Sequence, residues 1–206
     1  MININKQFGD FNLSANIGYS YSNYWARTKG YRGPLKLVPN LFSFGNIDAS
    51  GARSIEDGGN SPVRNNALFA NVELGWKSML YLTLTGRNDW NSRLVNTQEE
   101  SFFYPSVGLS AIISQMVNLP DWFSYLKVRG SYTEVGAPVS RSGLTPGTST
   151  IPIVGGILQE TGIYPFSDFK AERTRSYEFG LEMRLWNNLR AQVTYYKSNT
   201  YNQTFL

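Results

Sequence analysis

The feature that most constrains the fold is a strict two-residue alternation of apolar and polar side chains. From position 11 to position 21, every odd residue is apolar or aromatic, and every even residue is Asn, Ser or Gly. Successive side chains of a strand point to opposite faces, whereas a helix would spread this pattern around its circumference. The alternation therefore predicts a β-strand with one apolar face and one polar face.

The same alternation returns along most of the chain. It marks a partial strand before Phe8 and the segments 68–76, 80–87, 103–113, 126–132, 177–185 and 189–195. The segments with given bounds are 7 to 11 residues long, which exceeds the usual length in soluble sheets and suits a tilted strand that crosses a bilayer. The sequence predicts an all-β fold: an antiparallel transmembrane β-barrel segment of about eight strands.

The connections between these strands alternate between short and long. Short turns are expected at 8–10, 77–79, 114–122 and 186–188, and long connections at 28–66, 91–101 and 136–173. Barrel strands in the outer membrane are joined by tight periplasmic turns and by longer extracellular loops. We therefore expect the three long connections to be extracellular loops, and we expect residues 57–60 (DGGN) within the first to form a turn.

The composition agrees with a wall between lipid and water. Charged residues make up only 17% and aromatic residues 15% of the chain, and no apolar run approaches the roughly 20 residues of a spanning helix. Trp76, Trp122 and Trp186 lie at short turns, and Trp25 and Trp90 lie at the opposite strand ends. This placement predicts two interfacial aromatic girdles, with tryptophan packing at the ends of an ordinary sheet as the alternative.

Residue usage excludes several kinds of function. The chain has no Cys and no His, which removes disulfides, thiolate sites and the commonest general base and metal ligand. Its Lys and Arg residues are scattered rather than clustered, which argues against a nucleic-acid partner. We expect no catalytic site, no cofactor and no metal. Glu178 and Glu182 are about 13 Å apart along one strand face, too far for a glycosidase pair, and are expected to be solvated lumen charges near Arg184.

One polar group stands out at the end of an expected outward-running strand. Arg87 and Asp89 share a face, and Arg87 falls opposite the lipid-facing Leu82 and Leu84. A charge on the lipid face costs about 2–4 kcal/mol at mid-depth, and pairing in the lumen is the usual remedy. We expect an ion pair that shapes the lumen wall, while direct contact with a ligand remains the alternative.

Ligand contacts are expected in the outer loops and the upper lumen, where aromatic side chains can pack on a ligand or on one another. The aromatic residues in this region are Tyr24, Tyr31, Phe42, Phe44, Trp90, Phe102 and Tyr164. The candidate ligand or lumen contacts are Arg87, Asp89, Trp90, Tyr104, Tyr24 and Tyr164.

Several strings in the second part of the chain resemble the barrel of SusC/RagA-type, TonB-linked outer-membrane transporters. The strings are 81–90 (YLTLTGRNDW), 102–107 (FFYPSV), 126–136 (LKVRGSYTEVG), 175–182 (RSYEFGLE) and 193–196 (VTYY). No single string is specific, but their order and spacing together are similar to that family from about residue 68 to residue 204.

The resemblance implies a barrel of 22 strands closed around a plug in the bacterial outer membrane. It implies import of glycan or peptide nutrients, driven by the TonB complex through N-terminal parts, and a SusD-like surface lipoprotein as partner. The N-terminus has no apolar signal-peptide core. We therefore interpret residues 1–206 as a partial barrel from the C-terminal half, without plug or signal peptide. The alternatives are a small stand-alone outer-membrane barrel with a structural or adhesion role, and a soluble carbohydrate-binding β-sandwich.

Overall fold

The computed structural model describes most of the 206 residues. The described ranges are 1–48, 54–59, 62–138, 143–148, 153–154, 156–158, 164–165 and 167–203. The chain divides into two compact units, one made of Met1–Ser22 with Asn65–Leu206 and one made of Asn23–Arg64. Each unit is described by itself below.

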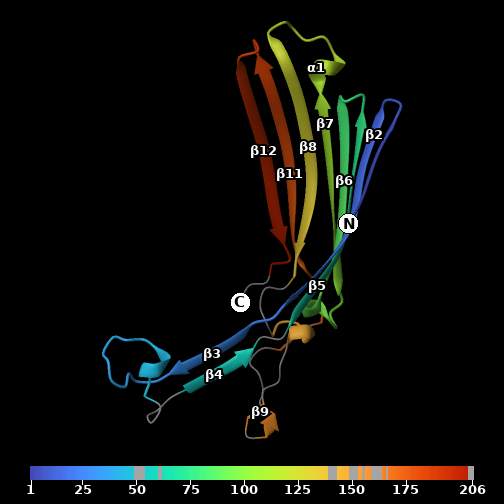
Figure 1. The fold of residues 1–206 in the computed structure, drawn as a ribbon. Coiled ribbons are helices and arrows are strands. Elements are labelled where there is room, and N and C mark those ends of the chain that lie inside the picture. The colour runs from blue at the N-terminus through green and yellow to red at the C-terminus, as the bar shows by residue number, and fades with distance from the viewer. Residues whose placement is uncertain are drawn as a thin grey trace. The chain divides into compact units, whose positions relative to one another are not determined.

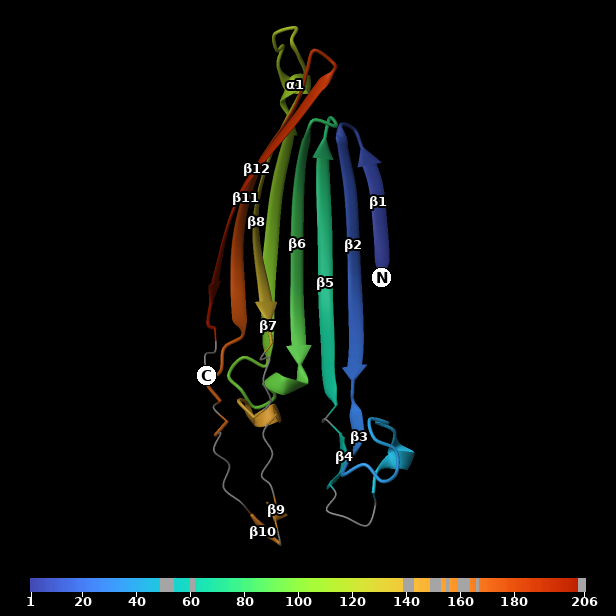
Figure 2. The same cartoon turned by 90° about the vertical axis from the view of Figure 1, so that its left-hand side faces the viewer.

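The first unit contains one eight-stranded sheet in which every pair of neighbours is antiparallel. Its strands run side by side in chain order (Figure 2). They are β1 (Ile2–Phe8), β2 (Phe11–Tyr24), β5 (Val63–Trp76), β6 (Leu80–Asn91), β7 (Ser101–Ile112), β8 (Phe123–Ala137), β11 (Glu172–Leu185) and β12 (Leu189–Tyr201). The prediction of about eight antiparallel strands is confirmed.

The register carries the alternation from strand to strand. Leu82 lies between Leu74 and Leu109, and its neighbour Thr83 lies between Glu73 and Gly108. Apolar side chains therefore meet apolar side chains across the sheet, and polar ones meet polar ones. The apolar face carries exposed side chains, among them Phe179, which is 57% exposed. A soluble β-sandwich would bury that face between two layers, which does not agree with this exposure.

The short connections lie together at one end of the sheet (Figure 2). Gly9, Lys77 and Ser78 all have positive φ angles, of 58°, 49° and 57°, which is the backbone twist that tight hairpin turns require. The connection from β7 to β8 also contains a single helical turn, α1 (Ile113–Met116), closed by a hydrogen bond from Val117 N–H to the Ile113 carbonyl. The sequence pattern predicted only a turn there.

The second unit contains a hairpin of β3 (Arg27–Arg32) and β4 (Ser54–Gly59), with the 3₁₀ turn η1 (Phe44–Asn46) between them (Figure 1). The expectation of a turn at 57–60 is wrong for Asp57, Gly58 and Gly59, which belong to β4 and pair with β3. Asn60 lies outside the described residues. Asp and Gly disfavour strands only weakly, so the pairing with β3 outweighs their preference for turns.

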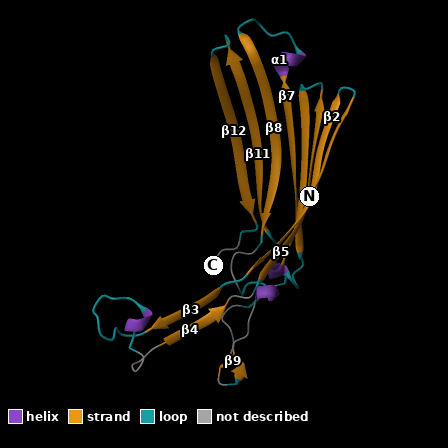
Figure 3. Ribbon diagram, in the orientation of Figure 1, coloured by secondary structure: helices purple, strands orange, loops and turns teal. Residues whose placement is uncertain are grey.

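Short elements also occur in the other long connections. They are η2 (Ser92–Leu94), η3 (Pro146–Thr148) and a hairpin of β9 (Ile153–Val154) and β10 (Ile157–Leu158), joined through Gly156 at a φ of 81°. Figure 3 places these turns among the loops that follow β6 and β8. In the part of the chain that the structure describes, no helix is long and apolar enough to cross a membrane.

Candidate functional site

A three-residue polar cluster occupies the polar face where β6 and β7 pair. The Nε of Arg87 donates to Oδ1 of Asp89 at 2.8 Å, and the hydroxyl of Tyr104 donates to Oδ2 of the same carboxylate at 2.6 Å. The register places Tyr104 directly opposite Arg87, whose guanidinium lies 5.9 Å from the ring of Phe69. The expected ion pair between Arg87 and Asp89 is present. Both oxygens of the buried Asp89 carboxylate are satisfied, which holds the three side chains in one geometry.

The other candidate residues are not part of this cluster. Trp90 follows Asp89 and therefore points to the opposite, apolar face of β6. Tyr24 ends β2 and is exposed, and Tyr164 is exposed in the connection from β8 to β11. The structure thus brings together Arg87, Asp89 and Tyr104, and it places Trp90 on the opposite face of the same strand.

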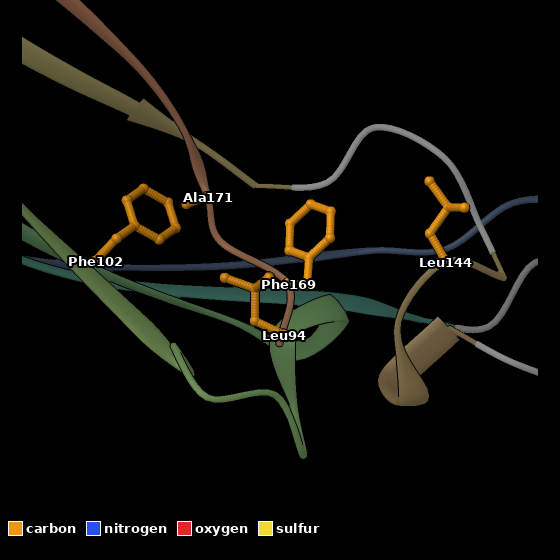
Figure 4. Packing of buried hydrophobic residues seen from close by; sticks show 5 residues of the cluster. All are labelled: Leu94, Phe102, Leu144, Phe169 and Ala171. Atoms are coloured by element: carbon orange, nitrogen blue, oxygen red, sulfur yellow. The ribbon is translucent and has the colours of Figure 1, made fainter. Parts of the chain in front are cut away.

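The loops that follow β6 and β8 share a hydrophobic core. Its buried side chains are Leu94, Phe102, Leu144, Phe169 and Ala171, with the Tyr104 ring packed against them (Figure 4). Phe102, near the start of β7, is only 2% exposed, so the packing that was one of the two expectations for this aromatic residue is present. Among the other loop aromatics, Phe42 and Phe44 are exposed, and the Tyr31 side chain lies outside the described residues.

Hydrogen bonds join the same two loops. The Gln98 amide donates to the Ser167 carbonyl at 2.7 Å, and the buried Thr145 hydroxyl donates to the Arg93 carbonyl. The Glu99 carboxylate accepts from the Ala171 amide at 3.4 Å. The two loops are therefore one packed layer at the long-loop end of the strands.

A second polar cluster, centred on Glu134 of β8, was missed by the sequence interpretation. Its carboxylate accepts hydrogen bonds from Arg173 at 2.8 Å, Arg175 at 3.1 Å, Tyr132 at 2.9 Å and Tyr201 at 3.0 Å. Glu134 is only 6% exposed. Four donors, two of them charged, compensate the desolvation of this carboxylate and tie β8, β11 and β12 together.

The pattern contained a signal for this cluster. Arg173 and Arg175 continue the odd-numbered series of Tyr177 and Phe179, and the register of β11 with β12 is unbroken over these positions. The predicted strand began only at residue 177, because the series of apolar side chains begins there. Continuing the two-residue alternation back from Tyr177 by two more repeats would have placed both arginines on the apolar face.

Further ion pairs line the polar face of β8, β11 and β12. Glu178 pairs with Arg129 at 3.0 Å, and Glu182 pairs with Arg190. The two glutamates lie on the polar face, and their ion-pair partners are Arg129 and Arg190. No group of three His, Cys, Asp or Glu side chains that could hold a metal ion occurs in the described part of the chain.

The second unit presents a preorganised apolar loop. The buried Asn46 side chain accepts from the amides of Leu37 and Val38, and it donates to the carbonyls of Val38 and Leu41. Phe42 nevertheless remains 86% exposed. An exposed apolar segment held in one shape is typical of a surface that contacts another protein.

Comparison with known proteins agrees with these observations. The family model described as TonB dependent receptor-like, beta-barrel, matches residues 2–206. TonB-dependent receptor P3 of Formosa agariphila is 26% identical over 205 residues, which cover 95% of this chain and 20% of that protein. This chain therefore spans about a fifth of the length of that relative.

Solved structures give the same result for the fold. The structure of the RagAB peptide transporter superposes on this chain with a TM-score of 0.71 and 19% sequence identity. The superposed part covers 96% of this chain and 22% of the transporter chain. The copper transporter OprC superposes on 94% of this chain and 27% of its own, with a TM-score of 0.50 and 17% identity. The chain belongs to the TonB-dependent receptor-like β-barrel family, whose members are transporters and receptors of the Gram-negative outer membrane.

Proposed function

We propose that this chain forms eight neighbouring strands of a SusC/RagA-type transporter that imports peptide or glycan nutrients across the outer membrane. The observation that carries the proposal is an eight-stranded sheet in which apolar side chains meet apolar ones, and polar side chains meet polar ones, across the pairs of β5, β6 and β7. The apolar face suits hydrocarbon, and the polar face suits a water-filled lumen.

The open edges of the sheet support a larger barrel over a small stand-alone one. Within the described residues, β1 and β12 each have one strand neighbour only and do not pair with each other. A stand-alone barrel of eight strands would close by pairing its first and last strands, because lipid cannot satisfy free backbone groups. Further strands of the same transporter are the natural partners of both edges.

The substrate proposal rests on the character of the long-loop end. In the first unit, exposed Tyr164 offers an aromatic ring, and Arg87 offers a charge on the polar face. Peptides and glycans both bind through such a mixture of aromatic packing and hydrogen bonds. The likeness to the RagAB peptide transporter favours peptides as the first class to test.

The proposed partners are the TonB complex, through parts of the transporter outside this chain, and a SusD-like surface lipoprotein. The apolar loop around Asn46 is the part of this chain that we assign to contact with the lipoprotein, because Leu37, Phe42 and Phe44 are exposed although the loop is held by Asn46. Replacing Phe42 and Phe44 by Ser in the full-length transporter should weaken capture of the lipoprotein, while Asn5→Ser and Ser14→Ala on the polar face should not.

Cysteine labelling tests the orientation of the wall. The chain has no Cys, so single substitutions give clean reporters. Leu82→Cys in the full-length transporter should react with a lipid-soluble maleimide and resist a charged one, because Leu82 is on the apolar face. Thr83→Cys, one residue away, should react with the charged reagent. Equal labelling of both positions by the charged reagent would exclude a membrane wall here.

Ligand identity is tested by uptake. Cells that depend on the full-length transporter should accumulate labelled oligopeptides or oligosaccharides only when the TonB complex is energised. Uptake of oligosaccharides with no uptake of peptides would exclude the peptide preference. Absence of uptake of both classes in cells that display the folded protein would exclude the nutrient-import proposal.

A further inference from the structure

The outer ends of β11 and β12 carry a group of cations on the apolar face of the sheet. Arg173, Arg175 and Tyr177 alternate along β11, and Lys197 of β12 lies directly opposite Tyr177. Phe179 and Leu181 continue the same face toward the short-turn end. These three cations therefore lie on the face that the proposed function exposes to lipid.

The position of Arg175 along the strand matches the outer boundary of the hydrocarbon. Arg175 lies ten residues before Leu185, which adjoins Trp186 at the short turn. Ten residues span about 33 Å along a strand, or about 25 Å of membrane depth at a tilt of about 40°. The apolar band of an outer-membrane barrel is about 25 Å tall. Arg175 is thus at the level where acyl chains give way to headgroups.

The guanidinium of Arg175 is held in place by two contacts, but only one of its nitrogens donates a hydrogen bond to the described residues. Its Nε donates to Glu134 at 3.1 Å, and its Cζ lies 4.5 Å from the centre of the Tyr201 ring. Its two Nη groups make no hydrogen bond with the described residues, and about half of the side chain is exposed. A planar guanidinium held against a ring, with its outer edge free, is well suited to bind two oxygens of a phosphate.

The cluster keeps an excess of positive charge. Glu134 pairs with Arg173 and Arg175, and Lys197 is exposed and forms no ion pair with the described residues. Three cations and one carboxylate leave a net charge of +2. Lys197 lies about 20 Å above Leu189 by the same estimate, and its long stem can extend the ammonium group toward the headgroups.

We propose that Arg175 and Lys197, supported by Arg173, bind the phosphate of an anionic lipid headgroup in the outer leaflet. A lipid matches both parts of this surface, because its phosphate meets the cations and its acyl chains lie along Phe179, Leu181 and Val193. Free phosphate would use the cations alone. Tyr177 lies opposite Lys197, close to the level where aromatic side chains favour the headgroup layer. The inference rests on the proposed membrane orientation of this face.

The test uses the full-length transporter in detergent, with lipids added in defined mixtures and counted by native mass spectrometry. The wild-type protein should retain phosphatidylglycerol in preference to phosphatidylcholine. The double variant Arg175→Gln with Lys197→Gln should retain about fivefold less phosphatidylglycerol for each charge removed. The control variant Arg129→Gln with Arg190→Gln removes two cations from the opposite face and should retain as much as the wild type.

Equal phosphatidylglycerol retention by the two double variants would overturn the inference. Displacement of the lipid by millimolar inorganic phosphate would also overturn it, because the site would then be a free-anion site. Labelling at Leu82→Cys reports the membrane wall independently of these cations. Correct labelling with no selective lipid retention rejects the lipid site alone, and failed labelling rejects the proposed function itself.

Discussion

At the scale of single residues, two buried carboxylates organise the long-loop end of the sheet. Asp89 holds Arg87 and Tyr104 on the polar face, and Glu134 gathers donors from three strands on the apolar face. A carboxylate removed from water needs several donors to remain charged. Each carboxylate therefore fixes the side chains around it, and each can be tested by removing one partner.

Glu134→Gln in the full-length transporter should lower the free energy of unfolding by about 2–4 kcal/mol, because two arginines lose the charge that compensates them. Urea unfolding in detergent micelles measures this change. Glu178→Gln removes a half-exposed carboxylate from a single ion pair and should cost less than about 1 kcal/mol. Equal losses for the two variants would contradict the central role of Glu134.

Arg87→Ala tests whether the lumen ion pair shapes the wall or contacts the ligand. The variant leaves the buried Asp89 carboxylate with Tyr104 as its remaining side-chain donor, which should cost about 1–3 kcal/mol of stability. A structural role predicts that ligand affinity changes by no more than about twofold. Unchanged stability together with a large loss of affinity would assign Arg87 to ligand binding.

At the scale of elements, the two-residue period was sufficient to predict the strands and their order. It located all eight strands of the sheet because each continues the same apolar face. The strands predicted for β8 and β11 were too short, because Glu134, Arg173 and Arg175 interrupt the apolar series without ending the strand. It also missed the β3–β4 hairpin, because Asp57, Gly58 and Gly59 have no strand preference of their own and pair only through partner β3.

The candidate site was predictable only in part, for a related reason. The ion pair of Arg87 and Asp89 follows from alternation within one strand, so the sequence sufficed. The burial of Phe102 depends on Phe169 and Leu144, which come from a different loop. Contacts between distant segments leave no periodic trace in either one, and a single sequence cannot reveal them.

Phe102→Ala should loosen the layer formed by the loops that follow β6 and β8. The ring packs in the buried cluster, and a Cβ at Gly136 would overlap it. Its removal should cost about 3–5 kcal/mol within this layer and should speed proteolysis within residues 92–100. Phe103→Ala is the matched control, because Phe103 is 54% exposed on the opposite face. Equal cleavage rates in both variants would show that Phe102 does not hold the loops.

At the scale of the whole chain, the described sheet has two edge strands, β1 and β12, and each lacks a neighbour on one side. Its unpaired edge strands present backbone donors and acceptors to any other strand. Under the proposed function, curvature and closure depend on further strands of the transporter, and the 206 residues form one section of its wall. The superposed part makes up 22% of the chain in the RagAB peptide transporter structure, which fits this interpretation.

Expressed alone, the chain should associate through β1 and β12 in detergent and should give no compact, heat-sensitive band on a gel. The full-length transporter should give such a band, because closed barrels resist detergent until they are heated. Size-exclusion chromatography with light scattering provides an independent measure of association. A compact monomer of the chain alone would instead support the small stand-alone barrel.

The shared core of the two outer loops has a consequence for how such proteins diverge. Leu94, Leu144 and Phe169 fill one volume although they come from separate loops. A larger side chain at one of these positions must be matched by a smaller one at another. Related proteins that differ in these loops should therefore change both loops together, and paired changes of side-chain size at these three positions would record each such change.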